Sequence, residues 1–327
     1  SQAGSYQLMV THQNQENQIN TATAQLFRPY SGCETIQVRS RTANEGFGGG
    51  LGEASDPYLI CTPDQLNQVR SLSETTDLHF VLANDIDLAD PDTNGDLEVN
   101  ANDNNYQSGS GWAPITSFGG VLDGNGFEIR NLFIRSNSGQ KALFSSLGNS
   151  SVIRRLLLLD FDIQAPVAAA LANQSQAAIE EVFLSGRIEC RADCSGLTNF
   201  QVNGSIKRIV TKAHILSTQI ENSTASAGIV GWLQDSIISD SHVLSEASIK
   251  SKGERIGGIV AGIISQEAII LHSSNAASIE AEEGTVSSRV GGLVGSVESN
   301  TPDSRIFILN SSNKGRIDGD SFVGGLL

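Results

Sequence analysis

Gly291-Gly292-Leu293-Val294-Gly295 is the fullest copy of a short signature that recurs in the C-terminal half of this 327-residue chain. A small residue and a glycine precede two aliphatic residues in each copy. The second glycines of four copies stand at positions 228, 258, 292 and 325, so the steps between them are 30, 34 and 33 residues. A repeat of this length indicates a solenoid, in which each unit packs only on its neighbours.

Weaker copies extend the repeat towards the N-terminus at Ala142-Leu143-Phe144, Ala170-Leu171-Ala172 and Gly196-Leu197-Thr198. A second marker, in which an isoleucine follows a small residue by two positions, keeps the same phase. Another isoleucine lies 9 to 11 residues upstream of each marker. The markers are Ile188, Ile215, Ile249, Ile279 and Ile317, and the upstream residues are Ile179, Ile206, Ile238, Ile269 and Ile306.

Each unit therefore holds three short segments rich in β-branched residues and bounded by Gly, Ser, Asn and Asp, which is typical of strands. The helical pattern of apolar residues at i, i+3, i+4 and i+7 is missing, and a propeller blade would be longer. The sequence predicts an all-β fold, a right-handed, three-sided parallel β-helix with coils of 26 to 34 residues.

Polar and charged residues recur at fixed distances from these markers, and we expect them to stack between coils. Two polar ladders are predicted, one of His242, His272 and Asn310 and one of Ser245, Asn275 and Asn313. A third ladder consists of charged pairs that each follow an aligned isoleucine (Ile153, Ile179 or Ile206). The sign of the charge alternates from one pair to the next. Its members are Arg154-Arg155, Glu180-Glu181 and Lys207-Arg208.

These repeats resemble the GLUG motif, which Gly292-Leu293-Val294-Gly295 matches in full, whereas Ala261 replaces the last glycine of another copy. The lead-in is also similar, from Asp56-Pro57-Tyr58-Leu59-Ile60 through a helix-like stretch at 63–69 to Asp123-Gly124-Asn125-Gly126. The resemblance covers residues 54–327. It implies a β-helix in a large bacterial surface or secreted protein, such as an adhesin or the non-catalytic part of an immunoglobulin-cleaving protease.

Residues 1–53 lack this pattern, so we expect an N-terminal extension that either caps the first coil or ends a neighbouring domain. The polar stretch 13–25 suits a helix with Ile19 and Leu26 inward, or a tail, and Gly48-Gly49-Gly50 suits a linker. The β-helix, residues 54–327, stops inside a repeat signature, and we expect it to continue in a longer polypeptide with further domains.

Acidic residues outnumber basic ones by 36 to 21, which gives a net charge of −15 and argues against a nucleic-acid partner. No apolar stretch is long enough for a membrane span, and any signal peptide is expected to have been removed or left out of the sequence. Four cysteines, Cys33, Cys61, Cys190 and Cys194, suit two disulfides in an oxidising compartment, Cys33 with Cys61 and Cys190 with Cys194. The alternative is four buried thiols.

The sharpest candidate site lies in an acidic loop that fits the first half of a calcium-binding loop. Side-chain oxygens alternate along it, and Gly95 permits a sharp turn. Ala101 stands where a bidentate glutamate is expected, so Glu98, Asp103 or water would have to complete the shell. The alternative is an acidic insertion between coils. The predicted Ca²⁺ ligands are Asp90, Asp92, Asn94, Asp96 and Glu98.

Three functions follow as hypotheses. The first is an extracellular, calcium-supported adhesion scaffold, without catalytic residues, that binds a protein or glycan of a host or neighbouring cell. The alternative is a carbohydrate-active β-helix enzyme, of lyase or epimerase type, which would use the charged ladder. An ice-binding solenoid needs aligned threonines, and Thr198, Thr211 and Thr285 do not share one phase.

Overall fold

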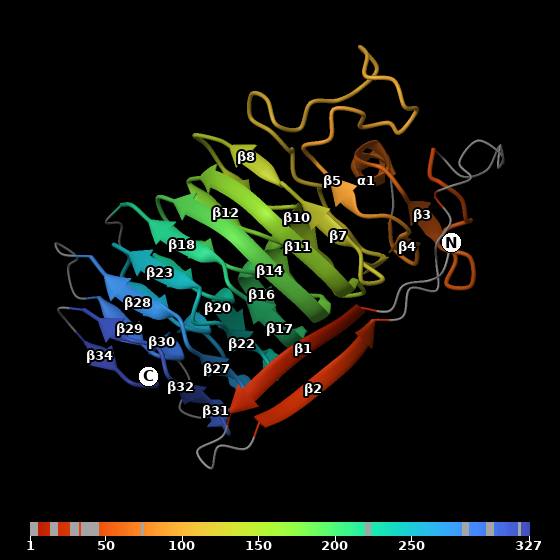
Figure 1. Cartoon of the computed structure of the whole chain (residues 1–327). Helices are drawn as coiled ribbons and strands as arrows, with labels where there is room; N and C mark the ends of the chain where they lie inside the picture. The colour runs from red at the N-terminus through yellow and green to blue at the C-terminus, as the bar shows by residue number, and fades with distance from the viewer. Residues whose placement is uncertain are drawn as a thin grey trace.

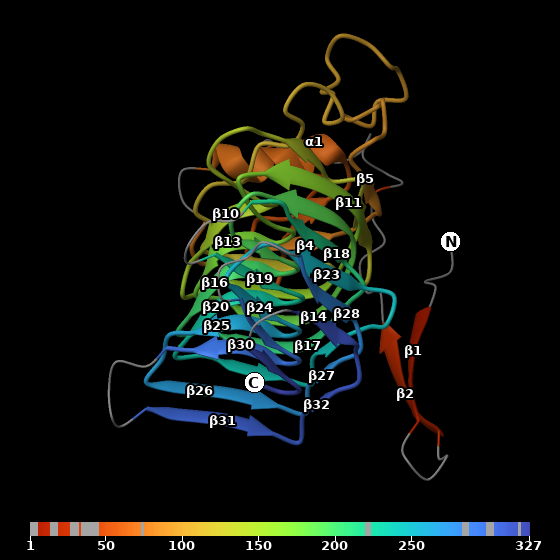
Figure 2. The ribbon, with the colours of Figure 1, turned by 90° about the vertical axis from the view of Figure 1, so that its left-hand side faces the viewer.

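The computed structural model describes residues 6–13, 19–26, 33, 46–72, 75–219, 224–282, 288–298, 304–319 and 322–327. From residue 46 onward the described chain winds into a three-sided parallel β-solenoid. Its coils stack in chain order, from the end that carries α1 (Pro63–Gln68) to the C-terminus (Figure 1, Figure 2). The predicted three-sided parallel β-helix is confirmed.

Two sides of the solenoid flank the repeat signature, and we name them sheet I and sheet II. Both are entirely parallel, and each strand pairs with the strand one coil away. Sheet I contains β9 (Gln140–Lys141), β12 (Val167–Ala169), β15 (Cys194–Ser195), β19 (Ala225–Ala227), β24 (Arg255–Gly257), β29 (Arg289–Gly291) and β34 (Val323–Gly324). Sheet II contains β10 (Phe144–Leu147), β13 (Ala172–Ser175), β16 (Thr198–Val202), β20 (Val230–Gln234), β25 (Val260–Ile263) and β30 (Val294–Val297).

The third side, sheet III, is longer and bends at its corners. Its N-terminal strands are β3 (Tyr58–Ile60), β4 (His79–Leu82), β5 (Ile86–Asp87), β6 (Val121–Asp123), β7 (Glu128–Arg130), β8 (Phe133–Arg135), β11 (Val152–Ala165), β14 (Ala178–Cys190), β17 (Ser205–Thr211) and β18 (His214–Ser217). The C-terminal coils add β21 (Ile237–Ser239), β22 (His242–Val243), β23 (Ser248–Ser251), β26 (Glu267–Leu271), β27 (Ser274–Asn275), β28 (Ser278–Ala281), β31 (Arg305–Leu309), β32 (Ser312–Asn313) and β33 (Ile317–Asp318).

The repeat signature forms the corner between sheets I and II. The backbones of neighbouring coils lie so close there that a Cβ on Gly228 would overlap the carbonyl oxygen of Gly258. The same holds for Gly258 against Gly292 and for Gly292 against Gly325. The aliphatic residues that follow the first three of these glycines, Ile229, Ile259 and Leu293, are fully buried in the core. The signature is therefore a packing requirement, in which glycine admits the next coil and the aliphatic side chain fills the interior.

The marker isoleucines form the predicted column. Ile188, Ile215, Ile249, Ile279 and Ile317 pair in register from coil to coil. In the upstream column, however, Ile238 pairs with Ile270 and Ile270 with Ile308, so the predicted places of Ile269 and Ile306 were wrong. β26 contains four adjacent aliphatic residues, so the spacing alone does not show which of them point into the core.

Each of the two predicted polar ladders is correct only in its last two coils. His272 lies beside Asn310, with Nε2 and Nδ2 3.1 Å apart, and Asn275 donates to Asn313 at 2.8 Å. His242 instead pairs with Ser274, and Ser245 is an exposed turn residue outside the ladder, so both of those predictions were wrong. The interval from β22 to the marker isoleucine is two residues longer than the matching interval in the next coil. Counting back a fixed number of residues from each isoleucine therefore paired the wrong positions.

The N-terminal end of the solenoid is covered by α1, as predicted for residues 63–69, and by the 3-10 turn η2 (Val69–Ser71). Thr62 accepts the Gln65 N–H at 3.3 Å and caps the helix, and Leu66 is fully buried (Figure 2). Phe47 also packs into the first coil, with its ring 4.7 Å from that of Tyr58. This end therefore supplies the apolar cover that a solenoid needs.

The helix or tail expected at 13–25 was wrong for the described part of that stretch, residues 13 and 19–25. β1 (Tyr6–Gln13) and β2 (Ile19–Leu26) pair antiparallel, with Tyr6 opposite Leu26 and Gln13 opposite Ile19. In β2, Ala22, Ala24 and Leu26 alternate with Thr21, Thr23 and Gln25, a period of two that suits a strand.

We predict that Gly258→Ala destabilises the solenoid by about 1–3 kcal/mol, because the added methyl group meets the carbonyl oxygen of the next coil. Gly325→Ala is the matched control, since nothing lies within 4 Å of its added Cβ. Urea denaturation of both variants checks the difference. Equal midpoints would contradict the close approach of the coils.

Candidate functional site

One corner of sheet III carries a column of residues in the left-handed backbone region, with φ between 49° and 57°. Non-glycine residues rarely adopt this region, and those that do are often Asn or Asp. Here the charged members alternate in sign from coil to coil. The column consists of Asn125, Arg155, Glu181, Arg208, Asp240, His272 and Asn310.

The charged ladder lies in the predicted register, but among its members ion pairs join only Arg208 to the two glutamates in the described chain. Arg154 and Arg155 both bind Asp123, and the hydrogen bond to that carboxylate raises the pKa of Arg155. Arg208 lies 2.7 Å from Glu181 and 3.2 Å from Glu180. Farther along, the His272 ring lies 3.5 Å from Asp240. These carboxylates already face cations, which suits a role in coil register better than acid–base chemistry.

The predicted calcium ligands lie in one loop, which projects from the N-terminal end of the solenoid (Figure 1). Their side chains accept backbone N–H groups of the loop itself: Asp92 from Gly95 at 2.8 Å and from Leu97 at 2.9 Å, and Asn94 from Asp96 at 2.8 Å. Asp90 accepts from Asp92 at 3.0 Å.

Asp103 organises the other half of this loop. It accepts the N–H groups of Asn100, Thr93 and Asn94, and the bond from Asn100 contributes most to lowering its pKa. Asp96 likewise accepts the N–H of Glu98 at 2.9 Å. Across the described ranges, no three His, Cys, Asp or Glu residues are grouped to hold a metal ion. In this arrangement the side-chain oxygens accept hydrogen bonds from the backbone of the loop and do not converge on one metal position.

Both predicted disulfides are present. Cys33 is bonded to Cys61 and Cys190 to Cys194, with Cα atoms 5.6 and 5.9 Å apart. The first bond ties Cys33 to the coil next to α1, and the second closes a tight loop between sheets III and I. Bonds of this kind persist in oxidising compartments.

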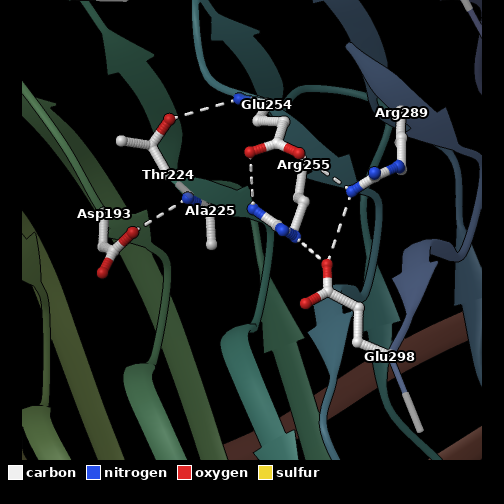
Figure 3. A network of polar contacts seen from close by, with 7 residues as sticks. All are labelled: Asp193, Thr224, Ala225, Glu254, Arg255, Arg289 and Glu298. Atoms are coloured by element: carbon white, nitrogen blue, oxygen red, sulfur yellow. Dashed lines mark hydrogen bonds and ion pairs between the residues drawn. The ribbon is translucent and has the colours of Figure 1, made fainter. Parts of the chain in front are cut away.

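A buried arginine on the outer side of the corner between sheets I and II was not anticipated from the sequence. The side chain of Arg255 is only 7% exposed. It binds Glu298 through Nε and lies 3.0 Å from Glu254 (Figure 3). Arg289, one coil away in register, reaches the same two carboxylates at 2.9 and 3.4 Å. Two arginines and two glutamates thus neutralise one another.

The Arg255 guanidinium covers the ring of Trp232, with its carbon 5.0 Å from the ring centroid. Trp232 stacks on Phe200 of the preceding coil, at 6.2 Å between centroids and 18° between planes. Gly262 leaves room for the indole, because a Cβ there would lie 2.5 Å from its Cζ3 atom. The side chain of Arg255 from sheet I and the rings of Trp232 and Phe200 from sheet II form one row, which we call the aromatic row.

A hollow of about 430 Å³ continues the aromatic row across the preceding coils of sheet II. Phe200 lies at one end, and Gln174 and Ser146 follow in register on the neighbouring strands. A smaller hollow of about 210 Å³ lies beside Asp123, Arg154 and Arg155 on sheet III. The aromatic row and its hollow combine an apolar ring with hydroxyl and amide groups, and they are the candidate binding site.

Comparisons with known proteins found relatives that are similar to parts of this chain. The chain is 28% identical over 221 residues to halomucin of Haloquadratum walsbyi, and 35% identical over 136 residues to a protein of Evansella cellulosilytica named as a Gly-rich membrane protein. These matches cover 67% and 39% of this chain but only 2% and 14% of the two relatives. No family model matches the chain.

Among solved structures, an IgA1 protease superposes with a TM-score of 0.53 at 16% sequence identity. The match covers 98% of this chain and 23% of the protease chain. At this identity the likeness shows the fold alone, and it agrees with the parallel β-solenoid described above.

We predict that Arg255→Ala lowers the free energy of unfolding by about 2–4 kcal/mol, because Glu254 and Glu298 lose a buried partner and Trp232 loses its cover. The Trp emission should also shift to the red as the indole meets water. Arg289→Ala is the control, since that side chain is 41% exposed and touches the same carboxylates. The prediction fails if both variants lose the same stability and leave the emission unchanged.

Proposed function

We propose that this chain is a binding scaffold within a larger secreted or cell-surface protein. The observation that carries the proposal is the parallel solenoid, whose neighbouring coils are joined by ion pairs such as Arg208 with Glu181 and Arg289 with Glu254. Such a body is stiff and displays long outer faces to a partner. No helix of the described chain has the length and apolarity to cross a membrane.

The similar proteins support this proposal by their names, since halomucin and the Gly-rich membrane protein suggest a cell-surface setting. The two disulfides suit an oxidising compartment. We extend the proposal to membership of the GLUG-repeat proteins, because the signature glycines occupy a corner where only glycine fits. Adhesion to a host or neighbouring cell follows as the biological role of the scaffold.

A screen for saturable binding tests the proposal. The labelled full chain is titrated onto arrays of bacterial and host polysaccharides and onto extracellular-matrix proteins, with heat-denatured chain as the control. We expect at least one saturable ligand for the folded chain and no shortening of any polysaccharide. Absence of saturable binding on every surface, or catalytic shortening of a polysaccharide, would contradict a binding scaffold.

Calcium binding by the loop from Asp90 to Glu98 stays a prediction. If it is correct, adding CaCl₂ to EDTA-treated protein raises the Tm, because the ion binds only the folded loop. Asp90→Asn keeps the single acceptor that Asp90 offers to the Asp92 N–H but removes one charge. We expect this variant to melt normally in EDTA and to gain less from calcium. Identical melting curves with calcium and with EDTA would remove calcium from the proposal.

A further inference from the structure

The hollow on sheet II lies between two outward-facing columns of side chains that run along the solenoid axis. The first column contains Ser146, Gln174 and Phe200, which pair in register on successive coils. The second contains Gly148, Gln176 and Val202. Gly148 has no side chain, so this column presents only backbone at that coil. Coils stack about 4.8 Å apart, so this groove repeats its binding groups once per coil.

The lining of the groove is uncharged, although the chain carries a net charge of −15. Its polar groups are hydroxyls and side-chain amides. Gln174 and Gln176 are exposed and Ser146 is half-buried, and all three line the hollow, so their side-chain donors and acceptors are accessible to a ligand. Such groups select a neutral, hydroxyl-rich ligand over an ionic one.

Phe200 contributes an aromatic ring to the groove, and the packing of Trp232 against that ring fixes its position. It stacks on Trp232, which lies beneath the Arg255 guanidinium, and Arg255 is itself bound by two glutamates. A ring held in this way loses little freedom when a ligand stacks on it. A flat ring beside outward amides matches the two faces of a sugar, since its C–H groups pack on the ring and its hydroxyls pair with the amides.

We infer that this groove binds an uncharged oligosaccharide, which lies along the solenoid axis with one sugar stacked on Phe200 and the following sugars beside Gln174 and Ser146. This inference rests on the proposed binding function and names its ligand class. The aromatic row sets one end of the site, because Trp232 beyond Phe200 is covered by Arg255 and only 7% exposed.

The inference is tested by calorimetric titration of the full chain with cellohexaose, xylohexaose and mannohexaose, and with oligogalacturonate as the anionic comparison. We expect at least one neutral oligosaccharide to bind, with an affinity that is the same in low and high salt. Phe200→Ala should weaken that binding about tenfold, as loss of an aromatic stacking contact does. Phe200→Tyr should retain it.

Phe307→Ala is the matched control, because Phe307 is an exposed ring on the outer side of sheet III, away from the groove. Melting curves show whether each variant is folded. The inference is overturned if only the anionic oligosaccharide binds, if Phe200→Ala binds as tightly as the unchanged chain, or if Phe307→Ala weakens binding equally. Saturable binding to a matrix protein without binding to any sugar overturns the oligosaccharide but leaves the binding scaffold standing.

Discussion

The close approach of neighbouring coils at the corner between sheets I and II is the constraint on which the rest of the structure depends. Gly228, Gly258 and Gly292 each face the carbonyl oxygen of the following coil, with no space for a side chain. This contact sets the distance at which the parallel strands on either side can pair. The aliphatic residue next to each glycine then reaches the interior at the same height in every coil, which gives an unbroken apolar core.

The corner of sheet III that carries the column of positive-φ residues is built from charged residues instead of glycines. Its backbone needs positive φ, which glycine would adopt most easily, yet Arg155, Glu181 and Arg208 occupy it. Their side chains reach across coils, and the ion pairs between Glu181 and Arg208 offset part of the conformational cost. Because alternate charges attract only when coils are in step, the column opposes a slip of one coil against the next.

The sequence allowed the coil architecture, the marker isoleucines and both disulfides to be predicted, since each depends on residues that repeat or pair locally. Prediction failed where neighbouring coils differ in length, as with His242 and Ser245. It also failed at Ile269, because four aliphatic residues in a row do not show which of them point into the core. The aromatic row was missed for another reason. Phe200 and Trp232 both follow the aliphatic residue after the signature glycine by three positions, and Arg255 and Arg289 both precede the first of the paired glycines by two. An alignment of the copies on their glycines would have brought these residues together, but one coil alone shows nothing unusual.

The candidate site lies where the repeat departs from its own pattern. Trp232 is too large for the regular packing of sheet II, and the chain accommodates it with Gly262 on the next coil and a guanidinium above it. Arg255 in turn requires two carboxylates, one of which, Glu298, lies 43 residues farther along the chain. A solenoid that needed only stability would fill this place with small aliphatic residues, as Ala225 and Ala261 do beside the indole. The added arginines, glutamates and indole together hold one ring, Phe200, at the edge of an open groove. That concentration of specific contacts behind an accessible ring is the physical reason to seek the binding partner on sheet II.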